Sequence, residues 1–334
     1  MKHVFIAAEA GVNHNGCLET AKRLIDTASD VGVDGIKFQT YKTQAIVSKH
    51  AGQASYQTKN TGKQMSQYEM LKQYEMDLEF HTTLISHCKS KNIKFFSTPF
   101  DIDSIELLDK LGMDLIKISS SEVTNYPYLK KIGSLKKSVI LSTGMSDLGM
   151  IEAALSVLTQ EGTSLDNITV LHANTEYPTP MQDVNLRAMQ TIEKAFGVKV
   201  GYSDHTNGIE VPIAAVALGA CVIEKHFTLD RNMEGPDHLA STEPEEFKQM
   251  VQAIRNISTA LGSSIKQVTP SEQKNIFPAR KSLTAIEPIQ VGELFTEKNL
   301  GIKRPGNGLN PMLWNQIIGK KSNKNYAIDE LITL

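Results

Sequence analysis

The chain has 334 residues, and its 35 lysines and arginines against 37 aspartates and glutamates give a formal net charge of −2 at pH 7. This balance provides neither the basic stripe of a nucleic-acid-binding protein nor a polybasic membrane patch, so we expect small-molecule partners, no nucleic acid and no membrane. The length exceeds the roughly 250 residues of a typical (β/α)8 barrel and leaves room for one small further domain.

The N-terminus shows no cationic lead followed by an apolar core, and no run of 18 or more apolar residues occurs. The three cysteines, Cys17, Cys88 and Cys221, are far apart and form no CxxC pair. These features predict a cytoplasmic protein without a disulfide framework.

Short β-rich runs alternate with helical stretches in a pattern that suits eight βα units. The expected strands are 3–9, 35–41, 94–98, 115–120, 139–143, 168–173, 198–203 and 221–227. The expected helices are 18–32, 104–112, 127–135, 150–162, 186–197, 211–219 and 245–262, and several end in Gly, which favours a left-handed C-terminal cap.

Parallel strands joined by helices can form a closed barrel or an open doubly wound sheet. Polar residues occur near the carboxyl ends of all the predicted strands instead of gathering at one switch point, and this favours a (β/α)8 TIM barrel with its site at that face.

Composition divides the chain into three parts. Residues 1–262 form the predicted barrel, within which the polar stretch 42–66 is long enough to be a lid or substrate loop. Residues 263–279, which contain two prolines, are a predicted linker. Residues 280–334 are too few for a secure independent core and suggest a compact β-rich module with one or two short helices.

Nine short motifs occur along the chain in the order found in a known family. They are AEAGVNHNG (8–16), KFQTYK (37–42), FSTPFD (96–101), KISSSEVTNYPYL (117–129), LSTGM (141–145), NTEYPTP (174–180), GYSDHTNG (201–208), IEKHFTLDRNMEGPDHLAS (223–241) and KRPGNG (303–308). Together they resemble the sialic acid (N-acetylneuraminate) synthase family, which includes the legionaminic acid synthases. The resemblance implies condensation of phosphoenolpyruvate (PEP) with an N-acylated hexosamine, on a barrel followed by an antifreeze-like (SAF) domain.

The resemblance also implies a divalent metal, Mn²⁺ in the first place, with Mg²⁺ or Co²⁺ as alternatives. His205 and His226 follow the last two predicted strands and are the expected ligands. Neutral imidazoles suit such a cation when oxygens from substrate and water complete its shell.

The PEP phosphate and carboxylate need cations and hydroxyl donors. By resemblance, the expected PEP-binding residues are Lys37, Thr98, Lys117, Ser120, Ser142, Thr175 and Ser203. Lys37 and Lys117 lie inside apolar strands, where an unpaired ammonium is costly and a bound anion would remove the penalty.

The carboxylates Glu9 and Glu122 match the family's catalytic positions, and both are expected to be recessed. By resemblance, we expect Glu122 to handle the proton of the attacking water and Glu9 to orient sugar hydroxyls. The expected sugar-binding residues are Gln39, Asn60, Tyr177, Asp237 and Arg304. Because Arg304 belongs to the C-terminal module, the resemblance implies a domain-swapped homodimer in which this arginine enters the other subunit's site.

The expected activity is therefore that of an N-acetylneuraminate synthase acting on N-acetylmannosamine. A legionaminic acid synthase using 2,4-diacetamido-2,4,6-trideoxymannose is the alternative within the class. A metal-dependent hydrolase or sugar isomerase is a second alternative, although such enzymes use more His, Asp or Glu ligands and do not need the two lysines. A non-catalytic alternative is that the terminal module binds glycans or ice. Residues 280–334 lack a flat, repetitive threonine face, which argues against ice binding.

Overall fold

The computed structural model describes residues 3–49, 51 and 66–333. It divides into two compact units, Met1–Gly262 and Ser263–Leu334. Asn60 and most of the predicted loop 42–66 lie outside the described residues.

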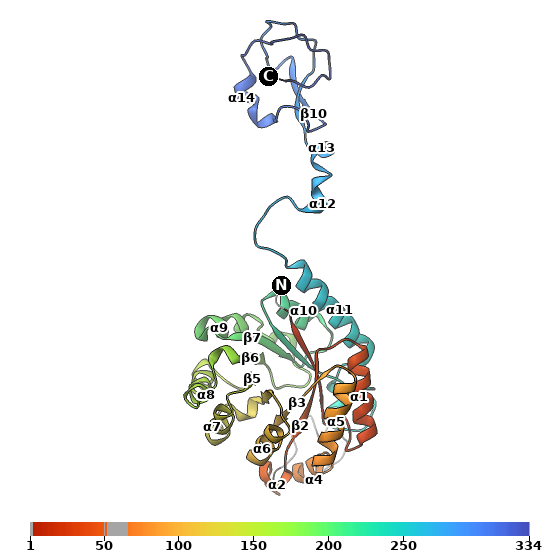
Figure 1. The fold of residues 1–334 in the computed structure, drawn as a ribbon, viewed down its shortest axis with the longest axis vertical. Coiled ribbons are helices and arrows are strands. Elements are labelled where there is room, and N and C mark those ends of the chain that lie inside the picture. Colours follow the sequence, from red (N-terminus) through yellow and green to blue (C-terminus); the bar gives the residue numbers. More distant parts are fainter. Residues whose placement is uncertain (1–2, 50, 52–65, 334) are drawn as a thin grey trace. The chain divides into compact units, whose positions relative to one another are not determined.

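Within the described part of the first unit, eight parallel strands pair in chain order into a closed barrel (Figure 1). They are β1 (Phe5–Gly11), β2 (Gly35–Thr40), β3 (Lys94–Pro99), β4 (Leu115–Ile118), β5 (Ser138–Ser142), β6 (Ile168–Ala173), β7 (Lys199–Asp204) and β8 (Val222–His226). The predicted TIM barrel is confirmed.

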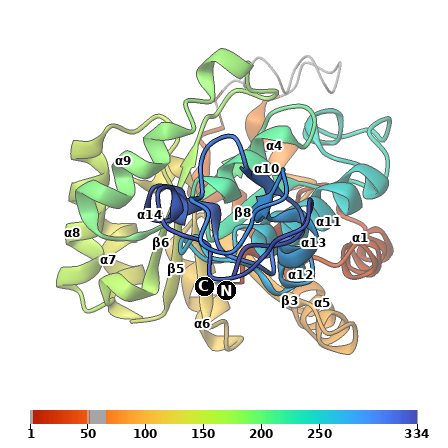
Figure 2. The ribbon, with the colours of Figure 1, turned by 90° about the horizontal axis from the view of Figure 1, so that it is seen from above.

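Helices surround the strands, as Figure 2 shows. They are α1 (Leu18–Asp30), α2 (Thr43–Ile46), α4 (Gln67–Lys72), α5 (Leu78–Ser90), α6 (Ile102–Lys110), α7 (Tyr126–Ser134), α8 (Leu148–Gln160), α9 (Arg187–Phe196), α10 (Glu210–Ala217) and α11 (Pro244–Ala260). Short 3-10 helices are η1 (Ser120–Glu122), η2 (Leu165–Asn167), η3 (Met181–Asp183) and η4 (His238–Ala240). No helix among the described residues has the length and apolar character needed to cross a bilayer.

Side-chain caps set several helix starts. Asp101 and Asp147 accept hydrogen bonds from the backbone of α6 and α8, so both helices begin two residues before their predicted starts. Gly112 and Gly162 follow the same two helices with positive φ, as the C-terminal cap prediction requires.

Helix α5 is an addition to the predicted helices. Its buried positions are His81, Leu84 and Cys88, a mixed set that carries a weaker periodic signal than a stripe of leucines and isoleucines.

The strand register stacks an apolar layer beneath a polar one inside the barrel. Ile140 and Val222 belong to a buried apolar cluster, and each lies two residues before a polar residue, Ser142 or Glu224, on the same strand. Because side chains two apart on a strand share a face, the polar residues sit at the carboxyl rim above a packed floor.

The second unit has its own apolar core. Strands β9 (Ser282–Ala285) and β10 (Leu300–Lys303) pair antiparallel, and short helices α12 (Pro270–Gln273), α13 (Ile276–Ala279), η5 (Pro311–Leu313) and α14 (Trp314–Ile317) accompany them. The core contains Leu283, Ala285, Ile289, Phe295, Leu300, Ile317, Tyr326 and Ile332. The predicted linker 263–279 holds α12 and α13 and is exposed along almost its whole length.

Candidate active site

A polar pocket lies at the carboxyl ends of the barrel strands. Its lining consists of Glu9, Lys37, Gln39, Thr98, Phe100, Lys117, Ser119, Ser120, Ser142, Tyr177, Ser203, His205, Glu224 and His226. Most of the residues predicted from sequence are thus brought together at one place, although they come from all eight strands of the barrel or the segments that follow them.

Lys37 lies between two carboxylates in this pocket. Its Nζ is 3.1 Å from Glu9 Oε2 and 3.3 Å from Glu224 Oε2, and it donates a 3.1 Å hydrogen bond to Thr98 Oγ1. The side chains of the ion pairs are almost fully buried. Acidic side chains from β1 and β8 thus already neutralise this ammonium, so its burial does not depend on a bound anion.

Lys117 is paired in a similar way. Its Nζ is 3.4 Å from Glu224 Oε1 and donates to Ser142 Oγ at 2.7 Å. Ser203 Oγ donates to the same Glu224 oxygen at 2.9 Å. Glu224 therefore joins both lysines and the predicted hydroxyl donors into one network.

The two carboxylates differ in acidity. Burial acts to raise the pKa of Glu224, but Lys117 and Lys37 outweigh it and lower the pKa to about 2. For Glu9, burial prevails over Lys37 and raises the pKa to about 7. Burial also lowers the pKa of Lys117 to about 8. The site thus contains a firmly ionised carboxylate and a second one that exchanges its proton near neutral pH.

Glu224, Ser119 and Phe100 were not predicted from the sequence. A signal for Glu224 was available, since it precedes His226 by two residues on β8 and must share its face. Ser119 follows β4 and Phe100 follows β3, and nothing in their local sequence distinguishes them from ordinary loop residues.

His205 and His226 lie side by side, with ring centroids 5.5 Å apart, and the ring of Tyr177 lies 4.2 Å from that of His205. His205 Nδ1 donates to the carbonyl of Asn174, while burial lowers the pKa of His205 to about 4. The ring is therefore neutral with its proton on Nδ1, which leaves Nε2 as a lone-pair donor.

His226 Nδ1 is buried and has no hydrogen-bond partner among the described residues. Burial lowers the pKa of His226 well below its usual range. The described residues contain no group of three or more His, Cys, Asp and Glu arranged to hold a metal ion. The two neutral imidazoles fit a divalent cation whose other ligands are oxygens of substrate and water.

Glu122 does not line the pocket. It ends η1, is half-buried, and accepts hydrogen bonds from Ser121 Oγ at 3.0 Å and Asn125 Nδ2 at 2.6 Å. Glu122 was expected to be recessed but is only half-buried, because the chain turns into η1 one residue after β4 instead of continuing the strand.

Thr175 also lies outside the pocket lining, although it is close to it. A Cβ on Gly144 would approach Thr175 Cγ2 to 2.6 Å and Ser120 Oγ to 3.0 Å. Ser120 Oγ accepts a 2.9 Å hydrogen bond from the Gly144 backbone. The absent side chain at Gly144 thus lets the ends of β4, β5 and β6 meet.

The predicted sugar-binding residues are divided. Gln39 and Tyr177 line the pocket, and Gln39 Nε2 donates to Glu9 Oε1 at 3.2 Å. Asp237 is half-buried outside the lining, and burial raises its pKa to about 6. Arg304 is exposed in the second unit, where its Nε donates to Ala279 O at 3.1 Å.

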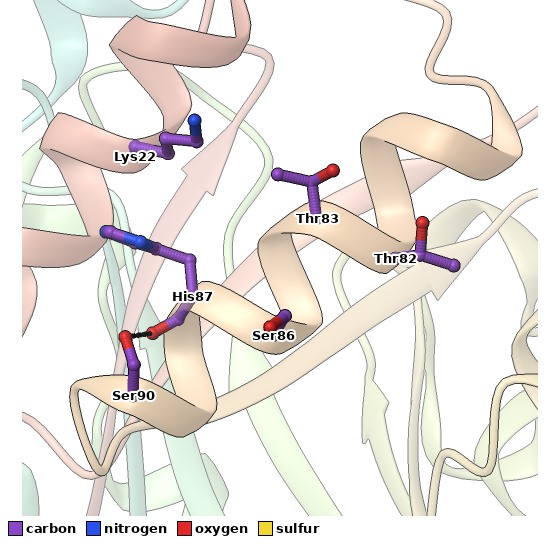
Figure 3. A pocket seen from close by; sticks show the side chains of 6 residues that line it. All are labelled: Lys22, Thr82, Thr83, Ser86, His87 and Ser90. Atoms are coloured by element: carbon purple, nitrogen blue, oxygen red, sulfur yellow. Dashed lines mark hydrogen bonds between the residues drawn. The ribbon is translucent and has the colours of Figure 1, made fainter.

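Another hollow lies between α1 and α5, on the helical layer (Figure 3). It is lined by Lys22, Thr82, Thr83, Ser86, His87 and Ser90. Thr82 and Ser90 bond to backbone carbonyls of their own helix, and His87 bonds to Asp26. Because Thr82, Ser90 and His87 are bonded locally and the lining contains no carboxylate, this hollow lacks the paired charges of the barrel pocket.

Comparison with known proteins identifies the families that the two units of the chain match. Residues 24–266 match the NeuB family and residues 280–334 match the SAF domain. The N,N'-diacetyllegionaminic acid synthase of Campylobacter jejuni is 54% identical over 99% of both chains. The protein of the same name from Legionella pneumophila is 46% identical, over 97% of this chain and 91% of its own.

A solved structure extends the likeness to three dimensions. The N-acetylneuraminic acid synthetase of Leptospira borgpetersenii superposes with a TM-score of 0.71 at 35% identity, over 82% of this chain and 90% of its own. The Campylobacter and Legionella matches span nearly the whole chain, so the resemblance found in the sequence is confirmed. The chain belongs to the NeuB family of sugar-acid synthases and carries a C-terminal SAF domain.

Proposed function

We propose that the protein condenses PEP with 2,4-diacetamido-2,4,6-trideoxymannose and water to give N,N'-diacetyllegionaminic acid and phosphate. The acceptor is chosen because the Campylobacter and Legionella relatives, similar along nearly the whole chain, both bear this activity in their names. Legionaminic acid synthesis, the alternative expected from the sequence, is therefore preferred to N-acetylneuraminate synthesis, which was the first expectation.

The main support for PEP as a substrate is the network of ion pairs and hydrogen bonds around Glu224. Lys37 and Lys117 both contact this carboxylate, and hydroxyls of Thr98, Ser142 and Ser203 surround them. A hydrolase or isomerase has no need for two buried lysines beside hydroxyl donors. A phosphate and a carboxylate on one small molecule would engage such a set by charge-assisted hydrogen bonds.

The acceptor would lie on the side of the two histidines. His205 and His226 would hold Mn²⁺, which supplies polarisation of the acceptor carbonyl when bound. Tyr177 packs against His205 at the pocket wall and offers a hydroxyl to the sugar. We also propose a homodimer in the cytoplasm, in which Arg304 of the partner subunit contacts an N-acyl group.

In the proposed reaction, C3 of PEP attacks the aldehyde carbon of the acceptor, water adds at C2, and the C2–O bond to phosphate breaks. Lys37 and Lys117 keep the negative charges of PEP in place throughout. Glu9 lines the pocket with a pKa of about 7, so we assign it the proton of the attacking water. Glu122, the sequence-based choice for that task, lies outside the lining.

The test uses purified protein with PEP, Mn²⁺ and either acceptor, and measures released phosphate. We expect a higher kcat/KM with the diacetamido sugar than with N-acetylmannosamine. The reverse order would restore the N-acetylneuraminate reading, and turnover without PEP would favour the hydrolase or isomerase reading. In ¹⁸O-water the label should enter the keto acid, whereas label found only in phosphate would exclude C–O cleavage.

A further inference from the structure

A buried ion pair lies next to the two histidines but outside the pocket. Lys225 Nζ contacts Asp204 Oδ2 at 2.5 Å, and the two side chains are 3% and 0% exposed. Neither residue lines the pocket, whereas their sequence neighbours His205, His226, Ser203 and Glu224 all do. No step of the proposed reaction uses either residue of this pair.

The alternation of strand side chains explains the arrangement. Asp204 and Lys225 are direct partners in the β7–β8 ladder, as are Ser203 and Glu224. Successive side chains on a strand point to opposite faces, so one couple faces the pocket and the other faces the helical layer. The ion pair therefore ties β7 to β8 from behind the site.

The same pair fixes the backbone on both sides of His205. Lys225 Nζ also donates to Thr206 O at 2.7 Å. Asp204 Oδ1 accepts from Thr206 N at 3.1 Å and from Thr206 Oγ1 at 2.8 Å. His205 lies between these two bonded residues, so the turn that sets the direction of its side chain is held by three hydrogen bonds and one ion pair.

The imidazole is held from the opposite side by the segment after β6. His205 Nδ1 donates to Asn174 O, and His205 O accepts from Thr179 N at 2.9 Å. The ring of Tyr177 packs against the imidazole. These contacts fix the tautomer of His205, while the ion pair fixes the backbone position from which its side chain projects.

We propose that Asp204 and Lys225 are positioning residues that aim the Nε2 of His205 for divalent-cation binding. The inference rests on the proposed metal site. A buried ion pair is a poor source of stability, because apolar residues of similar volume often serve as well or better. An apolar pair at these two positions could not form the hydrogen bonds to Thr206. It would therefore leave the direction of the His205 imidazole unfixed.

The decisive variant is the double substitution D204L/K225M, which removes both charges and fills their volume. Mn²⁺ binding is measured by calorimetry on the full chain without substrates, and folding is checked by circular dichroism and thermal unfolding. We expect a folded protein whose Mn²⁺ affinity is about 10 to 100 times weaker, the usual effect of losing an outer-shell partner. A second variant, D204N/K225M, keeps an acceptor for Thr206 but lacks the Lys225 bond to Thr206 O, so it should recover part of the affinity.

The matched control is the double substitution D34N/R255M. Arg255 Nη2 and Asp34 Oδ2 form another partly buried ion pair at 2.7 Å, before the amino end of β2, and Arg255 also donates to Val4 O. Its loss should reduce stability and leave Mn²⁺ affinity unchanged. An equal loss of affinity in this control would overturn the positioning role, because the effect would then be general.

Other results separate this inference from the proposed function. Wild-type affinity in folded D204L/K225M would overturn the inference while the metal site stands. Mn²⁺ binding that persists in both H205A and H226A, or is absent from the wild type, would overturn the metal site and the inference together. Unfolding of both Asp204/Lys225 variants would make the pair a folding element and also overturn the positioning role.

Discussion

Lys37 Nζ lies 3.1 Å from Glu9 Oε2, and both residues are more than nine-tenths buried. The ion pair is nevertheless unequal, because Lys37 also contacts Glu224, whereas Glu9 has one ammonium beside it. Burial therefore dominates at Glu9 and raises its pKa to about 7. Glu9 is the carboxylate of this site that can accept and release a proton near neutral pH.

The first prediction concerns Glu9. The substitution E9Q preserves size and one acceptor oxygen but removes the titratable carboxyl group, so kcat should fall by about 10² to 10⁴, the usual contribution of general acid–base catalysis. Phosphate release under saturating substrates measures the effect. The control is E122Q, which alters a carboxylate outside the pocket and should retain most activity. A larger loss in E122Q than in E9Q would return the proton-transfer role to Glu122.

The second prediction concerns the pH linkage of PEP binding. A bound anion raises the pKa of nearby groups, and both Glu9, at about 7, and Lys117, at about 8, would then hold protons more tightly. Protons should therefore be taken up on binding at slightly alkaline pH, and affinity should weaken as pH rises further. Calorimetry in buffers of different ionisation enthalpy measures the uptake. E9Q should show less uptake than the wild type, and equal uptake would remove Glu9 from the linkage.

The third prediction concerns Glu224. The substitution E224Q leaves Lys117 without an acidic contact and Lys37 with Glu9 alone, so unfolding free energy should drop by about 3 kcal/mol. Urea unfolding measures this drop. PEP should raise the Tm of E224Q more than that of the wild type, because its negative charges replace the missing carboxylate. E122Q is again the control, with an expected change of less than about 1 kcal/mol.

The fourth prediction concerns the C-terminal module. The barrel core and the module core are separate clusters, the first ending at Ile254 and the second beginning at Leu283. Deletion of residues 280–334 should therefore leave a folded barrel, yet turnover should be severely impaired because Arg304 is lost. Circular dichroism and phosphate release check the two halves of this expectation. Substitution R304A in the full chain should reproduce the loss, and near-normal turnover in the truncated chain would contradict the swapped-site proposal.

Part of the site could be predicted because side-chain direction along a strand is a local property. Lys37 and Gln39 are two residues apart on β2, and both line the pocket, as alternation requires. The same rule applied to β8 places Glu224 beside His226 on one face. No role was assigned to Glu224 from the sequence, because the role of a glutamate within a strand depends on which side chains of other strands it contacts.

Those partners could not be obtained from local sequence. Lys37, Lys117 and Glu224 are far apart along the chain, and closure of the barrel brings them within contact distance. The error at Glu122 has a related origin, since the turn into η1 after β4 depends on how the chain packs against neighbouring segments.

The sequence by itself determined the order of the strands and of most helices, the barrel, the terminal module and most of the pocket residues, because apolar periodicity, caps and alternation act over a few neighbouring positions. Only the tertiary structure decided which charges neutralise one another, that Glu9 and not Glu122 lines the pocket, and that Asp204 and Lys225 face away from it. Pairing and pKa depend on distances and burial between strands remote in the chain, and closure of the barrel sets both.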